Sequence, residues 1–244
     1  MAEGTHFRPD ADMADVASKL VARNLSDLAA KGAEPIGVLL SYALGKGNLE
    51  FLRGLHDALD EYSTKLLGGD TFKAQGARVF GMTAIGRATH TPVPSRSGAK
   101  AGDAVYVTGT LGRAMLGFEG DPSHRASFAR PRPLLREGQA LAPHVTAMMD
   151  VSDGLLLDCW RLAKASGTSI EISTALVPVA DFSRRSECIR WGDDYELLFT
   201  ADPNVAIPVA ASRIGTVTGD VSAALLLDGT AVESAQGLGY SHAD

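Results

Sequence analysis

The chain has 244 residues, 45% of them hydrophobic, and a formal net charge of −6. This length allows one large domain or two modest ones. The negative charge and the absence of a basic run argue against a nucleic-acid-binding protein, and no apolar run reaches the roughly 20 residues that cross a membrane. Because the start has no signal-peptide pattern, we expect a cytoplasmic protein. The two cysteines are too few for a disulfide framework and do not have the spacing of a zinc site, and we interpret Cys159 as a buried thiol of the core.

The first half of the chain contains both helical and strand patterns. Apolar residues recur every three or four positions after Asp12, which can cap a helix. Asn48 can cap a second helix in the same way. The patterns predict helices over residues 12–31 and from residue 48, and strands over 36–44, 65–67 and 79–85, the strand at 65–67 leading into a Gly-Gly-Asp loop.

Proline, serine and glycine are concentrated in residues 88–102, which we interpret as the connection between two domains. In the second half, strands and helices mix without a strict βαβ rhythm, which favours two α+β or α/β layers. Strands are predicted over residues 104–108, 145–149, 170–172, 196–200 and 223–227, and helices over 134–141 and 155–165. Asp228 and Gly229 form a hairpin turn signal.

Three short segments place an aspartate beside a small hydroxyl residue or a glycine: residues 24–27, 68–71 and 150–154. Such carboxylates suit Mg²⁺ and leave room for a phosphate on the metal. Each segment also has a structural explanation. Asp27 could lie on an exposed helix face, residues 69–71 could form a turn, and Ser152 or Asp153 could cap a helix. The three segments together indicate metal-assisted phosphate chemistry.

Two further segments add charge. Arg96 lies in a cationic loop over residues 96–100, which either contacts phosphate oxygens or is a solvated linker. Residues 192–197 place three carboxylates at the start of an apolar strand, where they either serve a site or protect a sheet edge. The sequence has no Walker A motif, GxGxxG or GxSxG, so a classical mononucleotide-binding fold is disfavoured.

These segments resemble the thiamine-monophosphate kinase family, within the superfamily that includes aminoimidazole-ribonucleotide synthetase and selenophosphate synthetase. The resemblance is carried by residues 3–7 (EGTHF), 24–33 (NLSDLAAKGA), 68–71 (GGDT), 96–100 (RSGAK), 150–154 (DVSDG), 194–200 (DYELLFT) and 239–242 (GYSH). It implies a two-domain α+β and α/β architecture, with an N-terminal sheet that pairs across a homodimer and a C-terminal mixed α/β sandwich. The implied domains are residues 1–95 and 96–244.

The resemblance also implies direct phosphoryl transfer from ATP to thiamine monophosphate, assisted by Mg²⁺. The implied metal ligands are Asp27, Asp70, Asp150 and Asp153, and the first three are also the implied catalytic residues. ATP would contact Gly69, Asp70, Arg96 and Ser152, and thiamine monophosphate would contact His6, Asp193 and Tyr240. We expect the four carboxylates to converge on one cleft.

The chain departs from the family pattern at three positions. Asp193 stands where glutamate is usual, Trp191 replaces a glycine, and Lys73 replaces an arginine and so loses its bidentate fork. The chain also begins just past the family's N-terminal metal-binding aspartates, so we expect weak catalysis by this chain alone. Two alternatives stay open: another ATP-dependent enzyme of the superfamily with a different small substrate, and a catalytically impaired nucleotide-binding or dimerisation protein.

Overall fold

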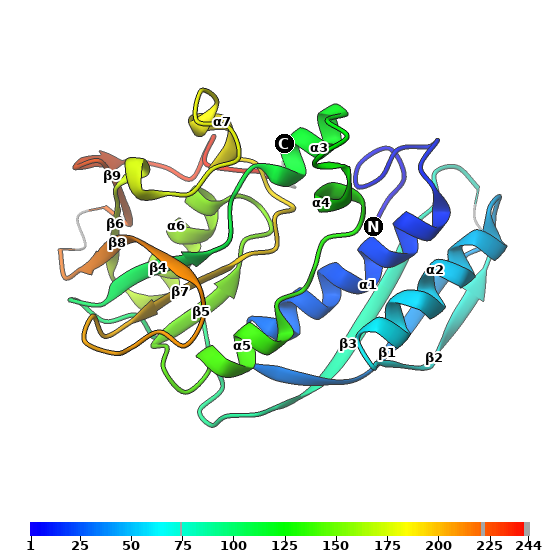
Figure 1. Ribbon diagram of the computed structural model, residues 1–244, viewed down its shortest axis with the longest axis horizontal. Coiled ribbons are helices and arrows are strands. Elements are labelled where there is room, and N and C mark those ends of the chain that lie inside the picture. The colour runs from blue at the N-terminus through cyan, green and yellow to red at the C-terminus, as the bar shows by residue number, and fades with distance from the viewer. Residues whose placement is uncertain (74, 221–222, 242–244) are drawn as a thin grey trace.

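The protein folds into two domains with α1 (Met13–Ala29) between them (Figure 1). This computed structural model describes residues 1–73, 75–220 and 223–241, so His242 of the predicted C-terminal motif lies outside the described residues. The described residues form a three-stranded sheet and a seven-stranded sheet. Every helix in these ranges is too short or too polar to span a bilayer.

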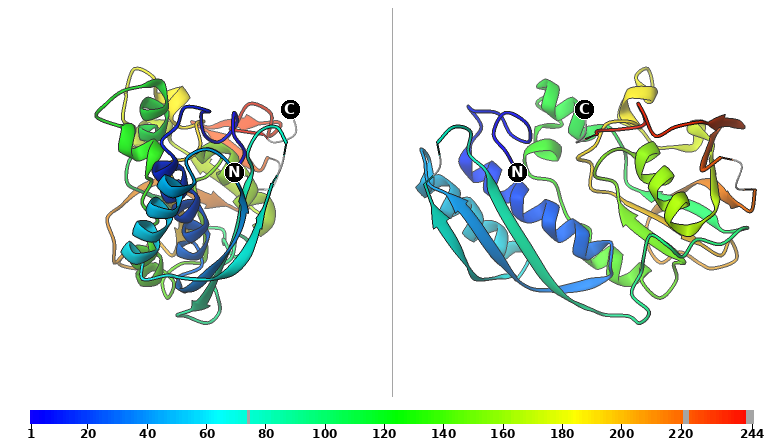
Figure 2. Two further views of the ribbon diagram at one scale, coloured as in Figure 1. Left: turned by 90° about the vertical axis from the view of Figure 1, so that its right-hand side faces the viewer. Right: turned by 180° about the vertical axis from the view of Figure 1, so that it is seen from behind.

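The first domain is a three-stranded sheet covered on one face by two helices. The strand order is β2–β1–β3, and β1 (Ala33–Ala43) runs parallel to β2 (Lys65–Phe72) and antiparallel to β3 (Phe80–Ala88). Helices α1 and α2 (Asn48–Glu61) pack together on that face (Figure 2). Between them and the sheet lies a cluster of stacked rings from Tyr42, Phe51 and Phe80, with ring centroids 4.8 to 5.5 Å apart.

The opposite face of this sheet is apolar and uncovered by any described helix. Along β1, Val38 and Leu40 are buried beneath the helices while Leu39 and Ser41 point outward and are exposed. Large apolar side chains that are at least 40% exposed gather on these strands: Ile36, Leu39, Leu66, Leu67 and Ile85. A contiguous apolar surface of this kind usually marks an interaction site.

Both predicted helices of the first domain form, but only one has the expected cap. Asp12 caps α1, because its carboxylate accepts a hydrogen bond from the Ala14 amide at 2.8 Å. The expectation that Asn48 caps α2 is wrong: the capping position is Gly47, in the left-handed region at φ 77°. The Asn48 side chain instead accepts a hydrogen bond from the Tyr42 hydroxyl at 2.7 Å, which ties the helix to β1.

The predicted Gly-Gly-Asp loop is part of a strand. Strand β2 continues through Asp70, which pairs with Ser41 of β1. The two strands approach so closely that a Cβ atom on Gly69 would lie 1.9 Å from the Leu40 carbonyl oxygen. The glycine that suggested a loop is therefore needed for close strand pairing.

The second domain is built on the seven-stranded sheet, in the order β10–β9–β6–β8–β4–β7–β5. Its strands are β4 (Ala104–Thr108), β5 (Ala147–Asp150), β6 (Ser169–Ile172), β7 (Leu197–Ala201), β8 (Ala211–Thr218), β9 (Leu225–Leu227) and β10 (Thr230–Val232). Its helices are α3 (Arg113–Glu119), α4 (Arg125–Ala129), α5 (Leu135–Leu141), α6 (Leu155–Ser166) and α7 (Arg185–Cys188), with a 3₁₀ turn η1 (Thr174–Leu176). Sequence reasoning missed α3, α4 and α7, because helices this short carry little periodicity.

Helix α1 joins the two domains at its C-terminal end. Ala29 and Ala30 pack in one apolar cluster with Leu141 of α5 and Phe199 of β7. The contact is close: a Cβ atom on Gly138 of α5 would lie 2.0 Å from the Ala29 carbonyl oxygen. A glycine in α5 therefore sets the distance between the domains.

We predict that Gly138→Ala separates α5 from α1 and lowers the free energy of unfolding by about 1–3 kcal/mol, as overpacking typically does. Urea denaturation measures the change. Gly219→Ala is the matched control, because an added Cβ there meets its nearest neighbour at 3.5 Å, an ordinary contact. Equal stability of both variants would show that the α1–α5 contact is looser than described.

Candidate active site

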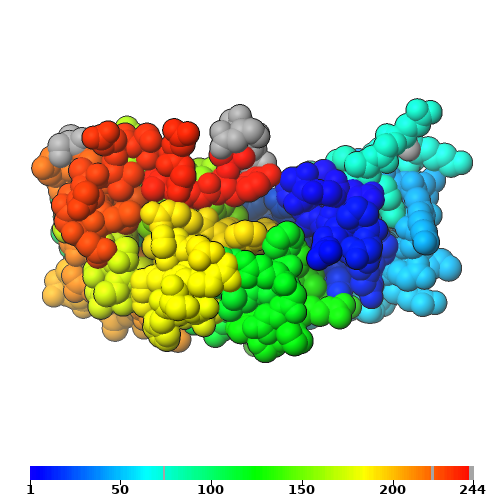
Figure 3. Space-filling model, turned by 90° about the horizontal axis from the view of Figure 1, so that it is seen from above, coloured from blue at the N-terminus to red at the C-terminus, as the bar shows by residue number. Residues whose placement is uncertain are grey.

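A cleft of about 570 Å³ opens between the two domains, a volume typical of small-molecule sites. The space-filling view shows the first residues of the chain (blue) beside the C-terminal segment (red) on this face (Figure 3). Residues that line the cleft include His6, Arg23, Phe118, Phe128, Ser152, Asp153, Trp191, Asp193 and Tyr240. Both domains therefore contribute walls.

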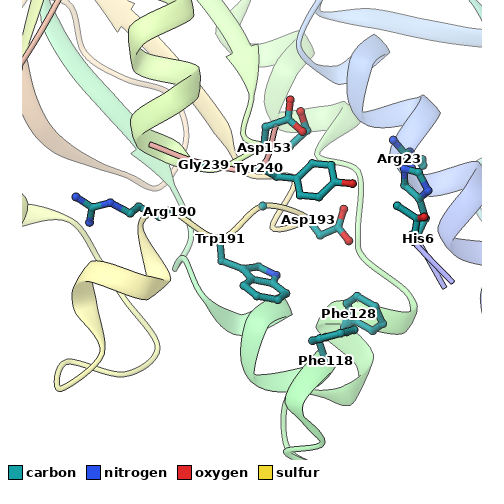
Figure 4. Close-up of a pocket in the computed structure, with 13 residues that line it drawn as sticks. His6, Arg23, Phe118, Phe128, Asp153, Arg190, Trp191, Asp193, Gly239 and Tyr240 are labelled. Carbon is teal, nitrogen blue, oxygen red and sulfur yellow. The ribbon is translucent and has the colours of Figure 1, made fainter. Parts of the chain in front are cut away.

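The three residues predicted to contact thiamine monophosphate lie in this one cleft. His6 comes from the N-terminal loop, Asp193 from the segment before β7, and Tyr240 from the C-terminal segment (Figure 4). The His6 imidazole accepts a hydrogen bond from the Ala2 amide at 3.0 Å. Burial, and then the nearby Arg23 guanidinium, lower the pKa of His6.

Aromatic rings form a second wall of the cleft. The Phe118 and Trp191 ring centroids are 5.4 Å apart, and Phe128 meets Phe118 edge to face at 5.2 Å. Such faces attract flat or cationic rings. The Trp191 ring is part of this wall (Figure 4).

Asp193 is held on both carboxylate oxygens. Lys19 of α1 lies 2.6 Å from one oxygen, and the Tyr195 hydroxyl donates to the other at 2.7 Å. Burial pushes the pKa of Asp193 up, but the Lys19 charge and these hydrogen bonds hold it below its usual value. Sequence reasoning missed Lys19 and Arg23, although two cations spaced i and i+4 beside a buried stripe were a detectable signal.

A second charged cluster lies where α1 meets β5. Asp150 is buried and accepts a hydrogen bond from the Ser26 hydroxyl at 2.7 Å. Burial, reinforced by the neighbouring charge of Asp27, raises the pKa of Asp150 to about 6. Asp27 lies on an exposed face of α1, which is the structural alternative considered for it. Partial desolvation nevertheless raises the pKa of Asp27, although the charges of Arg96, Arg23 and Lys31 act in the opposite direction. The cluster thus combines two carboxylates with cations.

The segment 152–154 is fixed at the start of α6. The amides of Ser152 and Asp153 both donate to the buried Asp158 carboxylate at 3.1 Å, and Asp153 forms an ion pair with Arg161 at 2.5 Å. Neither Ser152 nor Asp153 caps the helix, because Gly154 occupies the capping position and no side-chain cap is present. Both residues instead line the cleft.

The carboxylates of residues 192–197 other than Asp193 have structural partners. Asp194 accepts hydrogen bonds from the amides of Gly112 at 2.7 Å and Ala114 at 3.1 Å, which fixes the start of α3. Glu196 accepts from the Thr108 hydroxyl at 2.6 Å. Asp194 and Glu196 therefore have a structural role.

The expectation that the four carboxylates converge on one cleft is wrong for a single chain. Asp27 and Asp150 are neighbours and Asp153 lines the cleft, but Asp70 lies apart. It lies opposite Ser41, on the outer face of the sheet. Ser41 is eight positions along β1 from Ala33, which is near the end of α1, and eight positions span about 26 Å in an extended strand. In the described ranges, no three His, Cys, Asp or Glu side chains come close enough to hold a metal.

Comparison with known proteins identifies the family of this chain. Residues 1–88 match the family model of the AIR synthase related protein, N-terminal domain, and residues 100–227 match that of its C-terminal domain. The chain is 36% identical to the thiamine-monophosphate kinase of Escherichia coli (strain K12), over 87% of this chain and 73% of that protein. The chain belongs to the thiamine-monophosphate kinase family.

Other members of the thiamine-monophosphate kinase family show the same breadth of similarity. The Caulobacter vibrioides kinase is 34% identical over 91% of this chain and 70% of its own length. The crystal structure of the Aquifex aeolicus kinase superimposes with a TM-score of 0.85 at 27% identity, covering 96% of this chain and 87% of that one. A hydrogenase maturation protein, HypE, shares the fold alone, at 17% identity and a TM-score of 0.75.

The pKa of Asp150 leads to a prediction about stability. The folded protein binds this proton more tightly than the unfolded chain, so the contribution of Asp150 to stability decreases as the pH rises from about 4 to about 6. Asp150→Asn removes the buried charge and should stabilise the metal-free protein at pH 7 by up to about 3 kcal/mol. Urea denaturation in EDTA at pH 4 and pH 7 measures this gain.

The matched control for this prediction is Asp57→Asn, because the Asp57 side chain is 79% exposed. It should change stability equally at both pH values. A gain for Asp150→Asn that does not grow between pH 4 and pH 7 would contradict the raised pKa.

Proposed function

We propose that this chain transfers the terminal phosphoryl group of ATP to the phosphate of thiamine monophosphate, giving thiamine diphosphate and ADP. The observation that carries the proposal is the single cleft that gathers His6, Asp193 and Tyr240 from distant parts of the chain. Family membership supports it. A structure described as AaThiL complexed with AMPPCP and TMP also supports it, with a TM-score of 0.83 at 28% identity over 96% of this chain and 83% of that one.

The cleft matches the chemistry of thiamine monophosphate, which has a phosphate, a cationic thiazolium and an aminopyrimidine. Arg23 and His6 line the cleft, and Ser152 and Asp153 lie just before the start of α6, where the positive end of the helix dipole favours an anion. The thiazolium fits the faces of the aromatic wall. The Asp193 carboxylate is placed to accept a hydrogen bond from the pyrimidine amino group.

Asp27 and Asp150 would hold Mg²⁺ beside the phosphates of ATP. Mg²⁺ is commonly bound by one or two carboxylates, with phosphate oxygens and water completing its shell. Burial raises the pKa of both neighbouring carboxylates, and the charge of Asp27 adds to the effect on Asp150, so a bound cation would favour the ionised form of each. When bound, the metal would neutralise charge on the transferring phosphoryl group. Arg96 and Lys31 supply further positive charge. Gly69 and Ser152 stay predicted contacts of ATP, and Asp153 stays a predicted ligand of the metal.

The reaction needs positioning more than proton transfer. The acceptor is a phosphate monoester whose second pKa is about 6, so its oxygen is already ionised at pH 7. That oxygen forms a bond to the γ-phosphorus of ATP as the bond to the leaving ADP oxygen breaks. The chain's task is to hold two anions in line, and Arg23, Arg96 and the α6 N-terminus offset their repulsion.

We also infer that the chain works as a homodimer. In this proposal, residues 1–95 form the dimerising domain and residues 96–244 the second domain. A second copy would cover the exposed apolar face of β1, β2 and β3. In a two-fold dimer with antiparallel β1 strands, Asp70 of each chain would approach the partner's α1–β5 cluster. Asp70 could then bind the metal of the partner's site, which it does not reach in its own chain.

Incubation of the chain with ATP, Mg²⁺ and thiamine monophosphate tests the activity, with products separated by chromatography. Thiamine diphosphate and ADP should form in equal amounts. ADP formation without thiamine diphosphate, with a different small acceptor phosphorylated instead, would favour the other superfamily reaction.

We predict that Trp191→Leu raises the KM for thiamine monophosphate about tenfold, since loss of one ring–cation contact removes about 1–2 kcal/mol. The KM for ATP should be unchanged, because Trp191 lies in the aromatic wall and not in the α1–β5 cluster. Steady-state kinetics with each substrate varied gives both values. Trp160→Leu is the matched control: this partly buried ring lies beneath Lys164 and does not line the cleft. A similar KM increase in both variants would argue against the aromatic wall.

A mixing experiment tests the dimer. Asp70→Asn and Asp150→Asn should each be inactive as pure proteins. After unfolding and refolding together in equal amounts, about a quarter of the sites should be intact, because half of the dimers are mixed and each mixed dimer contains one complete site. Sedimentation at micromolar concentration should show two copies. A dimer whose mixture stays inactive would place Asp70 outside the partner's site, and a monomer would rule out the arrangement.

A further inference from the structure

Lys19 is a buried cation in the middle of α1 that does not line the cleft. Its side chain is 3% exposed. Burial of a charge is costly unless the charge is paired, and the partner here is Asp193, 2.6 Å away. The ion pair therefore links the first domain to a cleft residue of the second.

The backbone around Asp193 needs such a restraint. Asp193 and Tyr195 both have left-handed backbone conformations, at φ 64° and 52°, which residues other than glycine seldom adopt. Lys19 and the Tyr195 hydroxyl hold the Asp193 carboxylate from two sides. The Lys19 charge also keeps the carboxylate ionised, because it counters the effect of burial on the pKa of Asp193.

The same ammonium group contacts the aromatic wall. Lys19 Nζ lies 3.6 Å from the centroid of the Phe128 ring, a cation–π contact that fixes this ring beside Phe118. Asp193, Phe118 and Phe128 are all among the residues that line the cleft (Figure 4). One buried charge therefore orients both an acidic and an aromatic side of the cleft.

We propose that Lys19 is a positioning residue for substrate recognition, which holds the Asp193 carboxylate and the Phe128 ring ready for the aminopyrimidine and thiazolium rings of thiamine monophosphate. Lys19 itself contacts neither ring of the substrate. The inference rests on the proposed function. Its physical basis is preorganisation: a cleft whose groups are already fixed loses less conformational entropy on binding.

Lys19→Met tests the proposal, because methionine approximates the length of lysine without its charge. Calorimetry with the full chain should show that the Kd for thiamine monophosphate rises about 10- to 100-fold, the loss seen when a group that orients a ligand-binding residue is removed. The Kd for AMPPCP, an ATP analogue, should stay unchanged. Lys19→Arg, which keeps the charge, should recover part of the affinity.

Two controls separate positioning from folding. Lys164→Met removes an exposed lysine that lies over Trp160, 5.6 Å from its ring centroid, and should bind like the unmodified chain. Lys19→Met leaves the partly buried Asp193 carboxylate without its cation, which also destabilises the fold. Lys19→Met with Asp193→Asn removes both charges, so it should recover thermal stability without recovering affinity for thiamine monophosphate.

Three results would overturn the inference while the proposed function stands: unchanged affinity of Lys19→Met for thiamine monophosphate, equal loss of affinity for both ligands, or full recovery of affinity in the double variant. Each assigns Lys19 a purely structural role. An unmodified chain that binds AMPPCP but not thiamine monophosphate would instead overturn the proposed function, and the inference with it.

Discussion

Helix α1 is packed between the two domains, so its polar side chains find partners mainly across the domain boundary. Lys19 pairs with Asp193, and Ser26 donates to Asp150. Between these two contacts, Arg23 lines the cleft. The spacing of these residues along one helix therefore determines the separation between Asp193 in the cleft and the carboxylates of the α1–β5 cluster.

Much of the fold follows from local sequence patterns. The apolar stripe behind Asp12 predicted α1 and its cap, and the apolar run ending at Thr108 predicted β4 at its observed bounds. The quoted motifs indicated the family, and the family comparison agrees. They also named His6, Asp193 and Tyr240, which the fold brings into one cleft. Such patterns predict helices and strands because capping and apolar periodicity depend on residues that are close together in the sequence.

The remaining features depend on contacts between distant segments. Gly69 looked like a turn residue, but its neighbour across the sheet, Leu40, requires a glycine for strand pairing. Helices α3 and α4 are too short to show a period, so the ring wall of Phe118 and Phe128 was not predicted. The site residues at Asp27, Asp70, Asp150 and Asp153 stay predictions. Their proposed roles require a bound metal and, for Asp70, a second chain, and neither requirement is encoded in local spacing.

The cleft takes side chains from both His6 and Tyr240, and Tyr240 is translated long after His6. Until Asp193 has been translated, Lys19 has no carboxylate to pair with and must remain hydrated, so α1 does not become fully buried while the first domain is alone. A ligand that contacts both His6 and Tyr240 can therefore stabilise the cleft only after residue 240 has been translated.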